Sequence, residues 1–177
     1  ATLRVFGPDP AITSDRFATA AGLSQSQFLS AGAAVLARAD DYPDALAAAT
    51  LAAQVGGPVL LTRTGDLPTT PLLELQRLDV EQVVLAGGPA AVSDQVASTL
   101  EALGHEVVRV DGPTRFHTAA AIATRTGSVD DHAYLATAVN FADALAASAP
   151  AAALGRPILL THPDQLAEQA LGALVEL

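Results

Sequence analysis

Short runs of consecutive apolar residues alternate with longer, alanine-rich amphipathic segments along the chain. The short runs, such as PVLLT and QVVLA, are rich in Val and Leu, and a run that is apolar at every position is typical of a parallel strand buried on both faces. The longer segments have the length and spacing of the helices that connect parallel strands. The pattern therefore predicts an α/β fold, a three-layer α/β/α sandwich with mostly parallel sheets.

The two kinds of segment place the expected elements along the chain. We expect strands at residues 3–6, 34–37, 58–62, 82–86, 106–110, 133–137 and 157–161. We expect helices at residues 15–25, 43–55, 70–78, 93–103, 114–126, 142–154 and 165–177. The apolar stretch at 45–61 is interrupted by polar residues, glycines and a proline, so it predicts a helix followed by a strand and no membrane span.

The chain is internally duplicated. Residues 16–78 align without a gap on residues 115–177, at an offset of 99 positions, and 25 of the 63 pairs are identical. The lead-in RVFGP at residues 4–8 also matches RVDGP at 109–113, once a six-residue insertion is allowed in the first copy. We therefore expect two modules, a first one at residues 1–104 and a second one at residues 105–177.

The second copy is shorter than the first. The first copy continues into QVVLAGGPAAVSDQVASTLEALG, which predicts a strand, a glycine turn and a helix, whereas the second copy stops before any equivalent. A unit without this strand and helix leaves a sheet edge and an apolar face uncovered. We therefore expect either further repeats in a longer protein or cover supplied by another chain.

Composition narrows the function classes. Half of the residues are apolar, which is enough for a sizeable core, and the absence of Cys excludes disulfides, thiolate nucleophiles and thiolate metal sites. The formal charge of −10 argues against nucleic acid as a partner. The N-terminus has no signal-peptide pattern, which fits a cytoplasmic protein or the mature or excised part of an exported one. All basic residues besides His are Arg, which suits phosphate and carboxylate but equally reflects a GC-rich genome.

Three motifs recur in order in both copies. They are an R-F-x-T-A segment that opens a helix, a D-A-L helix preceded by an aromatic residue, and a P-[VI]-L-L-T strand; the first copy adds the turn GGPAAVS. The residues that carry them are Arg16, Phe17, Thr19, Ala20, Asp41, Tyr42, Asp44, Ala45, Leu46, Gly87, Gly88, Ala91, Val92 and Ser93, with Arg115, Phe116, Thr118, Ala119, Asn140, Phe141, Asp143, Ala144 and Leu145 in the second copy. These motifs resemble the cell wall-binding repeat 2 family of bacterial surface proteins.

The resemblance implies a protein outside the cell, at the cell wall or cell surface, that is anchored non-covalently through an anionic envelope polymer. It also implies packing against neighbouring modules of the same or another chain, including a homo-oligomer, with three modules as the usual set. Two positions depart from the pattern, since the family's Asp before the arginine is Thr114 in the second copy and its usual Asn is Asp41 in the first.

The repeated arginines are the first candidates for ligand contact. Arg16 and Arg115 open equivalent helices, where the N-terminal amides already favour an anion, and a guanidinium there would complete a site for phosphate or carboxylate. A structural clamp explains the repetition equally well, in which each arginine pairs with an acidic residue such as Asp44 or Asp143. Both interpretations stay open at the level of sequence.

The residues around the D-A-L helices are further ligand-binding candidates, namely Asp41, Asn140, Tyr42, Phe141, Asp44 and Asp143. The aromatic pair would stack on a sugar ring or fill a module interface. The two carboxylates in the first helical turn suit the helix dipole. The acidic cluster around Asp41 lacks the spacing of a calcium loop, so we expect no resident metal and no cofactor, although a divalent cation could bridge these carboxylates to a polyanion.

The turn GGPAAVS superficially resembles a phosphate cradle. It matches neither of the two nucleotide-binding glycine motifs, so Gly87 and Gly88 are expected to shape the turn and Ser93 to cap the helix that follows. The four histidines do not recur between the copies and have no catalytic spacing. We therefore expect a non-catalytic module. The alternative hypothesis is protein–protein assembly in a surface layer, and the weakest hypothesis is a nucleotide-binding enzyme.

Overall fold

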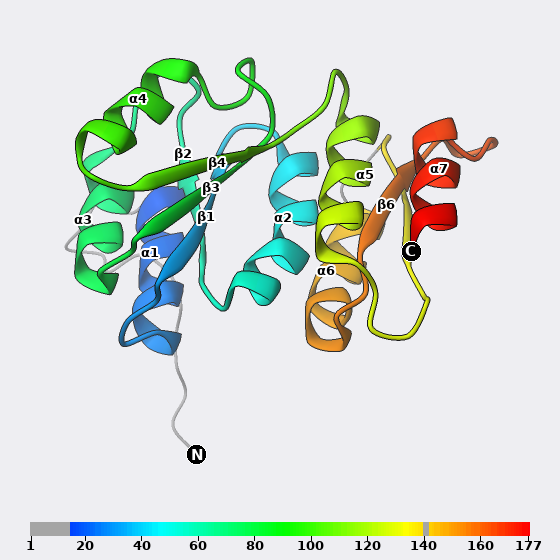
Figure 1. Ribbon diagram of the computed structural model, residues 1–177, viewed down its shortest axis with the longest axis horizontal. Coiled ribbons are helices and arrows are strands. Elements are labelled where there is room, and N and C mark those ends of the chain that lie inside the picture. The colour runs from blue at the N-terminus through cyan, green and yellow to red at the C-terminus, as the bar shows by residue number, and fades with distance from the viewer. Residues whose placement is uncertain (1–14, 140–141) are drawn as a thin grey trace.

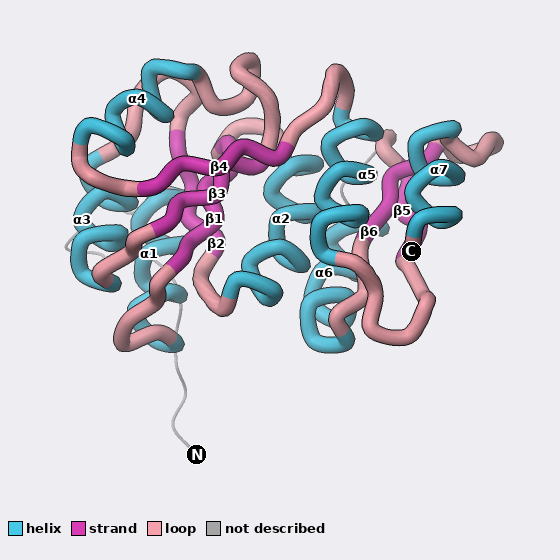
Figure 2. Tube along the Cα trace, in the orientation of Figure 1, coloured by secondary structure: helices cyan, strands magenta, loops and turns pink. Residues whose placement is uncertain are grey.

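The computed structural model describes residues 15–139 and 142–177, and the strand expected at residues 3–6 lies outside this range. Helices and parallel strands alternate along the chain, as the sequence pattern predicted (Figure 2). The elements are α1 (Arg16–Gln27), β1 (Ala33–Arg38), α2 (Tyr42–Val55), β2 (Val59–Thr62), α3 (Thr69–Leu78), β3 (Gln82–Ala86), α4 (Asp94–Ala102), β4 (Glu106–Val110), α5 (Arg115–Thr126), β5 (Tyr134–Thr137), α6 (Ala142–Leu154), β6 (Ile158–Thr161) and α7 (Glu168–Glu176).

The strands form two parallel sheets, and β4, which follows the module boundary expected at residue 104, belongs to the first of them. The first sheet has the order β2-β1-β3-β4 and the second pairs β5 with β6. Val35 pairs with Val59 in the first sheet, and Tyr134 pairs with Ile158 in the second. Both residues of the second pair lie 99 positions after their counterparts, so the duplication extends to the register of the strands. The predicted α/β fold with internally repeated parallel sheets is confirmed.

The first sheet is buried on both faces, which makes three layers. Side chains alternate across β1, so Ala34 and Leu36 join the apolar cluster under α3 and α4, while Val35 and Ala37 join the cluster that contains α2. Both clusters continue through β3, whose residues are completely buried from Val83 onward. The all-apolar strand pattern in the sequence follows from this two-sided burial.

Helix α2 lies between the two units (Figure 1). It packs against α5 and α6 as well as against its own sheet, and Ala47, Ala48 and Leu51 on it are at most 1% exposed. Alanine side chains keep the backbones close, so one helix can fill the space between two neighbouring layers. The alanine-rich sequence of α2 thus belongs to a helix that is packed on two sides.

The second sheet has an open edge. Strand β1 has a partner on each side, whereas β5 pairs only with β6 within the described residues. One face of this sheet is also less covered, because Leu36 on β1 is 0% exposed beneath α3 and α4, whereas the equivalent Leu135 on β5 is 51% exposed. The uncovered edge that we expected therefore lies on β5.

Two glycines allow the chain to turn from α2 into β2. Gly56 ends the helix in the left-handed conformation, with φ of 69°. Gly57 follows, and a Cβ atom on it would lie 1.9 Å from the carbonyl oxygen of Ala33 on β1. Only glycine lets the two backbones approach this closely.

A buried carboxylate joins α1 to α3. The side chain of Glu74 is 1% exposed and accepts hydrogen bonds from Arg77, with both Nε and Nη2 at 2.8 Å, and from Gln25 Nε2 at 3.1 Å. Burial alone raises the pKa of the Glu74 carboxyl, but the hydrogen bonds from its partners outweigh burial, so its pKa lies below the ordinary value. Arg77 also donates to the carbonyl oxygen of Phe28, which fixes the turn before β1.

Candidate functional site

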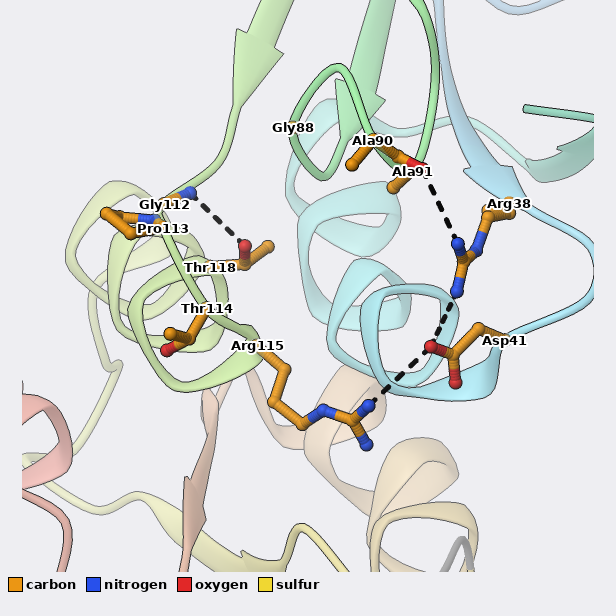
Figure 3. A pocket seen from close by; sticks show the side chains of 10 residues that line it. All are labelled: Arg38, Asp41, Gly88, Ala90, Ala91, Gly112, Pro113, Thr114, Arg115 and Thr118. Atoms are coloured by element: carbon orange, nitrogen blue, oxygen red, sulfur yellow. Dashed lines mark hydrogen bonds and ion pairs between the residues drawn. The ribbon is translucent and has the colours of Figure 1, made fainter. Parts of the chain in front are cut away.

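A cavity of about 180 Å³ lies past the carboxyl ends of β1, β3 and β4, where the two units meet (Figure 3). In open α/β sheets this is the side on which ligands bind, because the loops there diverge and leave a crevice. The residues that line it come from the end of β1, from three loops and from the start of α5. They are Arg38, Asp41, Gly88, Ala90, Ala91, Gly112, Pro113, Thr114, Arg115 and Thr118.

An ionic bridge crosses the cavity from one unit to the other. Asp41, at the N-terminus of α2, accepts a hydrogen bond from Arg38, with 2.6 Å between Asp41 Oδ2 and Arg38 Nη2. The same carboxylate oxygen lies 3.7 Å from Nη2 of Arg115, the first residue of α5 (Figure 3). Two guanidinium groups from different units therefore share one carboxylate.

Arg38 has further partners at the rim of the cavity. Its Nη1 donates to the carbonyl oxygen of Ala90 at 3.5 Å, in the loop that follows the glycine turn. Its Nε lies 3.1 Å from a carboxylate oxygen of Asp40, close enough for charge attraction but without hydrogen-bond geometry. The Asp40 side chain is 72% exposed, so solvent weakens this second pair.

The N-terminus of α5 differs from that of its repeat equivalent, α1. In α1 the carboxylate of Asp15 caps the helix by accepting from the amides of Phe17 at 3.1 Å and Ala18 at 3.0 Å. The equivalent residue before α5 is Thr114, which gives no side-chain cap and instead bonds His117 Nδ1 at 2.8 Å. The positive end of α5 therefore faces the cavity without a carboxylate of its own.

The two repeated arginines make the same backbone contact, but only one of them lines this cavity. Arg16 Nη1 donates to the carbonyl oxygen of Ala39 at 2.5 Å, and Arg115 Nη1 donates to that of Ala138 at 3.4 Å. These carbonyls follow β1 and β5 at equivalent places, so each arginine ties its helix to the neighbouring strand end. A structural role is therefore common to both, and the position at the cavity belongs to Arg115.

The remaining predicted site residues divide into three groups. Asp143 accepts a hydrogen bond from Thr137 at 2.8 Å and lies in the first turn of α6. Gly87 has a φ of 108°, Gly88 lines the cavity, and Ser93 caps α4 by accepting from the amide of Val96. Asn140 and Phe141, together with the side chains of Tyr42 and Asp44, lie outside the part that the structure describes.

The structure thus gathers Arg115, Asp41 and Gly88 and adds Arg38 to them. Repetition between the copies could not find Arg38, because the equivalent residue is Thr137. The signal that could have found it is its position at the last residue of β1, three residues before Asp41. Among the side chains that the structure describes, no His, Asp and Glu are grouped to hold a metal ion, and none of the described helices has the length and apolar character of a membrane span.

Two βα repeat units joined by a shared helix, with an arginine-lined cavity at their junction, define a modular α/β protein of the repeat type. The chain belongs to the family described as Cell wall binding domain 2 (CWB2), which matches residues 13–97 and 109–175. The family expected from the recurring motifs is confirmed, as is the expected place at the cell wall or cell surface.

Similar proteins agree with this assignment. The chain is 34% identical over 153 residues to "N-acetylmuramoyl-L-alanine amidase LytC" and 35% identical over 169 residues to "Amidase enhancer", both of Bacillus subtilis. These matches cover 86% and 92% of the chain but only 31% and 24% of the relatives. Among solved structures, Cwp8 and Cwp6 from Clostridium difficile superpose with TM-scores of 0.83 and 0.82, at 32% and 26% identity, over 90% of this chain and 28% and 26% of theirs.

Proposed function

We propose that the chain is a non-catalytic module that anchors a surface protein to the cell wall by binding an anionic envelope glycopolymer in the cavity between its two units. The observation that supports this is the convergence of Arg38 and Arg115, from different units, beside a helix N-terminus without a capping carboxylate. Guanidinium groups and free helix amides both favour carboxylate or phosphate oxygens.

The overall charge of −10 makes such binding depend on local charge. At physiological salt, charges more than about 8 Å apart are largely screened, so the polymer responds mainly to the residues that line the cavity. Asp41 neutralises part of the arginine charge, so a single anionic group binds the site only weakly. The site therefore favours a polymer that repeats its anionic group and can make several such weak contacts.

The matched pair of repeated arginines tests this proposal. We expect Arg115→Gln to reduce retention of the chain on isolated bacterial envelopes, because it removes a guanidinium from the cavity. Arg16→Gln removes the equivalent contact to a strand-end carbonyl but leaves the cavity intact, so it serves as the control. Retention is measured on envelopes with and without their non-peptidoglycan polymers. Equal retention of both variants and the unmodified chain would contradict the proposed site.

A second proposed function is assembly with further units of the same kind. In the second unit, Ile122, Ile158 and Leu160 are at most 3% exposed because α2 of the first unit covers the surface of α5 and β6. The equivalent residues of the first unit are Leu23, Val59 and Leu61, which line an apolar cavity of about 320 Å³. Within residues 15–139 and 142–177, the first unit therefore presents, uncovered, the surface that receives a helix in the second.

The complementary surface is present on α6, the repeat equivalent of α2. Thr50 and Leu51 of α2 are 5% and 0% exposed, whereas Ala149 and Pro150, at the same places on α6, are exposed. An exposed helix face at one end and an exposed groove at the other can associate head to tail. This supports association with a neighbouring module.

Sedimentation velocity over a range of concentrations tests the assembly. We expect the unmodified chain to associate as concentration rises and Leu23→Asp to abolish this, because it places a charge in the apolar groove. Leu73→Asp is the matched control, since Leu73 lies on α3 outside the groove and is already 58% exposed. If Leu23→Asp associated like the control, the groove would not be the contact surface.

A further inference from the structure

Both arginines that line the cavity between the units point at a single carboxylate, that of Asp41 (Figure 3). The three side chains are partly accessible, with 23% of Arg38, 31% of Asp41 and 40% of Arg115 exposed. Solvent, and therefore a ligand, reaches the bridge without unfolding of the protein. The carboxylate occupies the place that an anionic group of a ligand would need.

The Asp41 side chain does not make the contact that its position at the start of a helix suggests. Asp41 is the N-cap residue of α2, yet no side-chain cap hydrogen bond forms there among the described residues. The N-cap residues Asp15 and Ser93 do make such bonds, at α1 and α4. The carboxylate of Asp41 is directed at the guanidinium groups instead of the helix amides.

The second repeat copy carries a different pair at these positions. Arg38 and Asp41 correspond to Thr137 and Asn140, so the positive and the negative residue are both absent there. The same fold therefore forms without either of them, which separates this charge pair from the requirements of the βα unit. The bridge is a feature of the cavity between the units.

We infer that Asp41 is a built-in counter-anion that the anionic group of the ligand must displace, so that this residue sets the affinity of the cavity. The inference rests on the proposed binding of an anionic polymer. A carboxylate or phosphodiester of the polymer exchanges places with the Asp41 side chain, which rotates into solvent, so that the two arginines still share one anionic group. Such an exchange is weak at each site and readily reversible.

Asp41→Asn is the variant that isolates this role. Asn is as favourable as Asp at a helix N-cap, so the substitution keeps the local structure and removes only the competing charge. We expect it to raise affinity at least about fivefold, the factor that corresponds to two unit charges about 4 Å apart with the full screening of water. A bridge that served only to hold the units together predicts the opposite, namely lower stability and no gain in affinity.

The experiment compares the full chain and its variants by titration calorimetry with polygalacturonate, a carboxylate polymer, and poly(glycerol phosphate), a phosphodiester polymer. Asp40→Asn makes the same charge change next to the cavity and is expected to give a smaller gain, while Asp164→Asn, in an exposed loop of the second unit, is expected to give none. Urea unfolding of each variant reports stability separately.

The outcomes distinguish this inference from the proposed function. A rise with Asp41→Asn on either polymer, larger than with Asp40→Asn and with unchanged stability, supports the counter-anion. If Arg115→Gln abolishes binding but Asp41→Asn binds no tighter than Asp40→Asn, the counter-anion is overturned and the binding site stands. If neither the unmodified chain nor Asp41→Asn binds either polymer, both the site and the counter-anion are overturned.

Discussion

Two leucines at equivalent places in the repeat allow a direct test of how burial differs between the units. Leu36 on β1 is 0% exposed and lies in the apolar cluster beneath α3 and α4. Truncation of a fully buried leucine to alanine costs about 2–5 kcal/mol, because the lost transfer energy is joined by the energy of a cavity. We therefore expect Leu36→Ala to lower the free energy of unfolding by this amount.

Leu135 on β5 is the matched control, since it occupies the same place in the second unit but is 51% exposed. Full burial of a leucine is worth about 1.5–3 kcal/mol, so a side chain buried by half loses roughly 1 kcal/mol on truncation. The free energy of unfolding is measured by urea denaturation at low protein concentration. An equal cost for the two substitutions would falsify the assignment of an uncovered sheet face at β5, because Leu135 would then have to be covered in solution.

Three further predictions concern local structure. Gly57→Ala should destabilise the chain strongly, by more than about 2 kcal/mol, because its Cβ would overlap the carbonyl oxygen of Ala33, whereas Gly32→Ala, with open space around it, should have little effect in the same urea titration. Ser93→Ala should cost about 0.5–2 kcal/mol in thermal or urea unfolding, as the loss of the α4 cap; no change would show that the cap is dispensable. The Glu74 carboxyl has a lowered pKa, so its contribution to stability is present above its unfolded value near 4.5 and is lost as pH falls through the lower folded value. Glu74→Gln should therefore lower the urea midpoint at pH 7 and differ less and less from the unmodified chain below pH 4.5; a constant difference would contradict the pKa argument.

Most of the fold could be predicted because its signals are local and repeated. The strand at residues 82–86 and the helix at 142–154 occur at the predicted limits, since an unbroken apolar run and an alanine-rich segment are each bounded by turn residues. The start of the last helix was predicted three residues too early, at residue 165 instead of Glu168. The loop before it is polar and held by Thr161, whose hydroxyl donates to the carbonyl oxygen of Gln165, a contact that no periodicity reveals.

The candidate site could be predicted only in part, because its key contacts join residues of different units. Repetition pointed to Arg115 and Asp41 for separate reasons, and nothing in the spacing of 74 positions shows that they face each other. Arg38 was missed because a comparison of copies keeps only what recurs, and a residue that serves the junction of two units need not recur. The same comparison could not separate Arg16 from Arg115. Each donates a hydrogen bond to the carbonyl oxygen at the end of a strand, and they differ only in the residues that face them from the rest of the protein.

Helix α2 has a consequence for how arrays of such units behave. Because it is packed between its own sheet and the next unit, the energy that it contributes is a coupling between neighbours as much as a property of one unit. Stability then grows along a row of units as in a one-dimensional lattice, in which every added neighbour supplies one more coupling term. The units at the two ends have one neighbour fewer, so opening by thermal fluctuation is expected to start at the ends and travel inward.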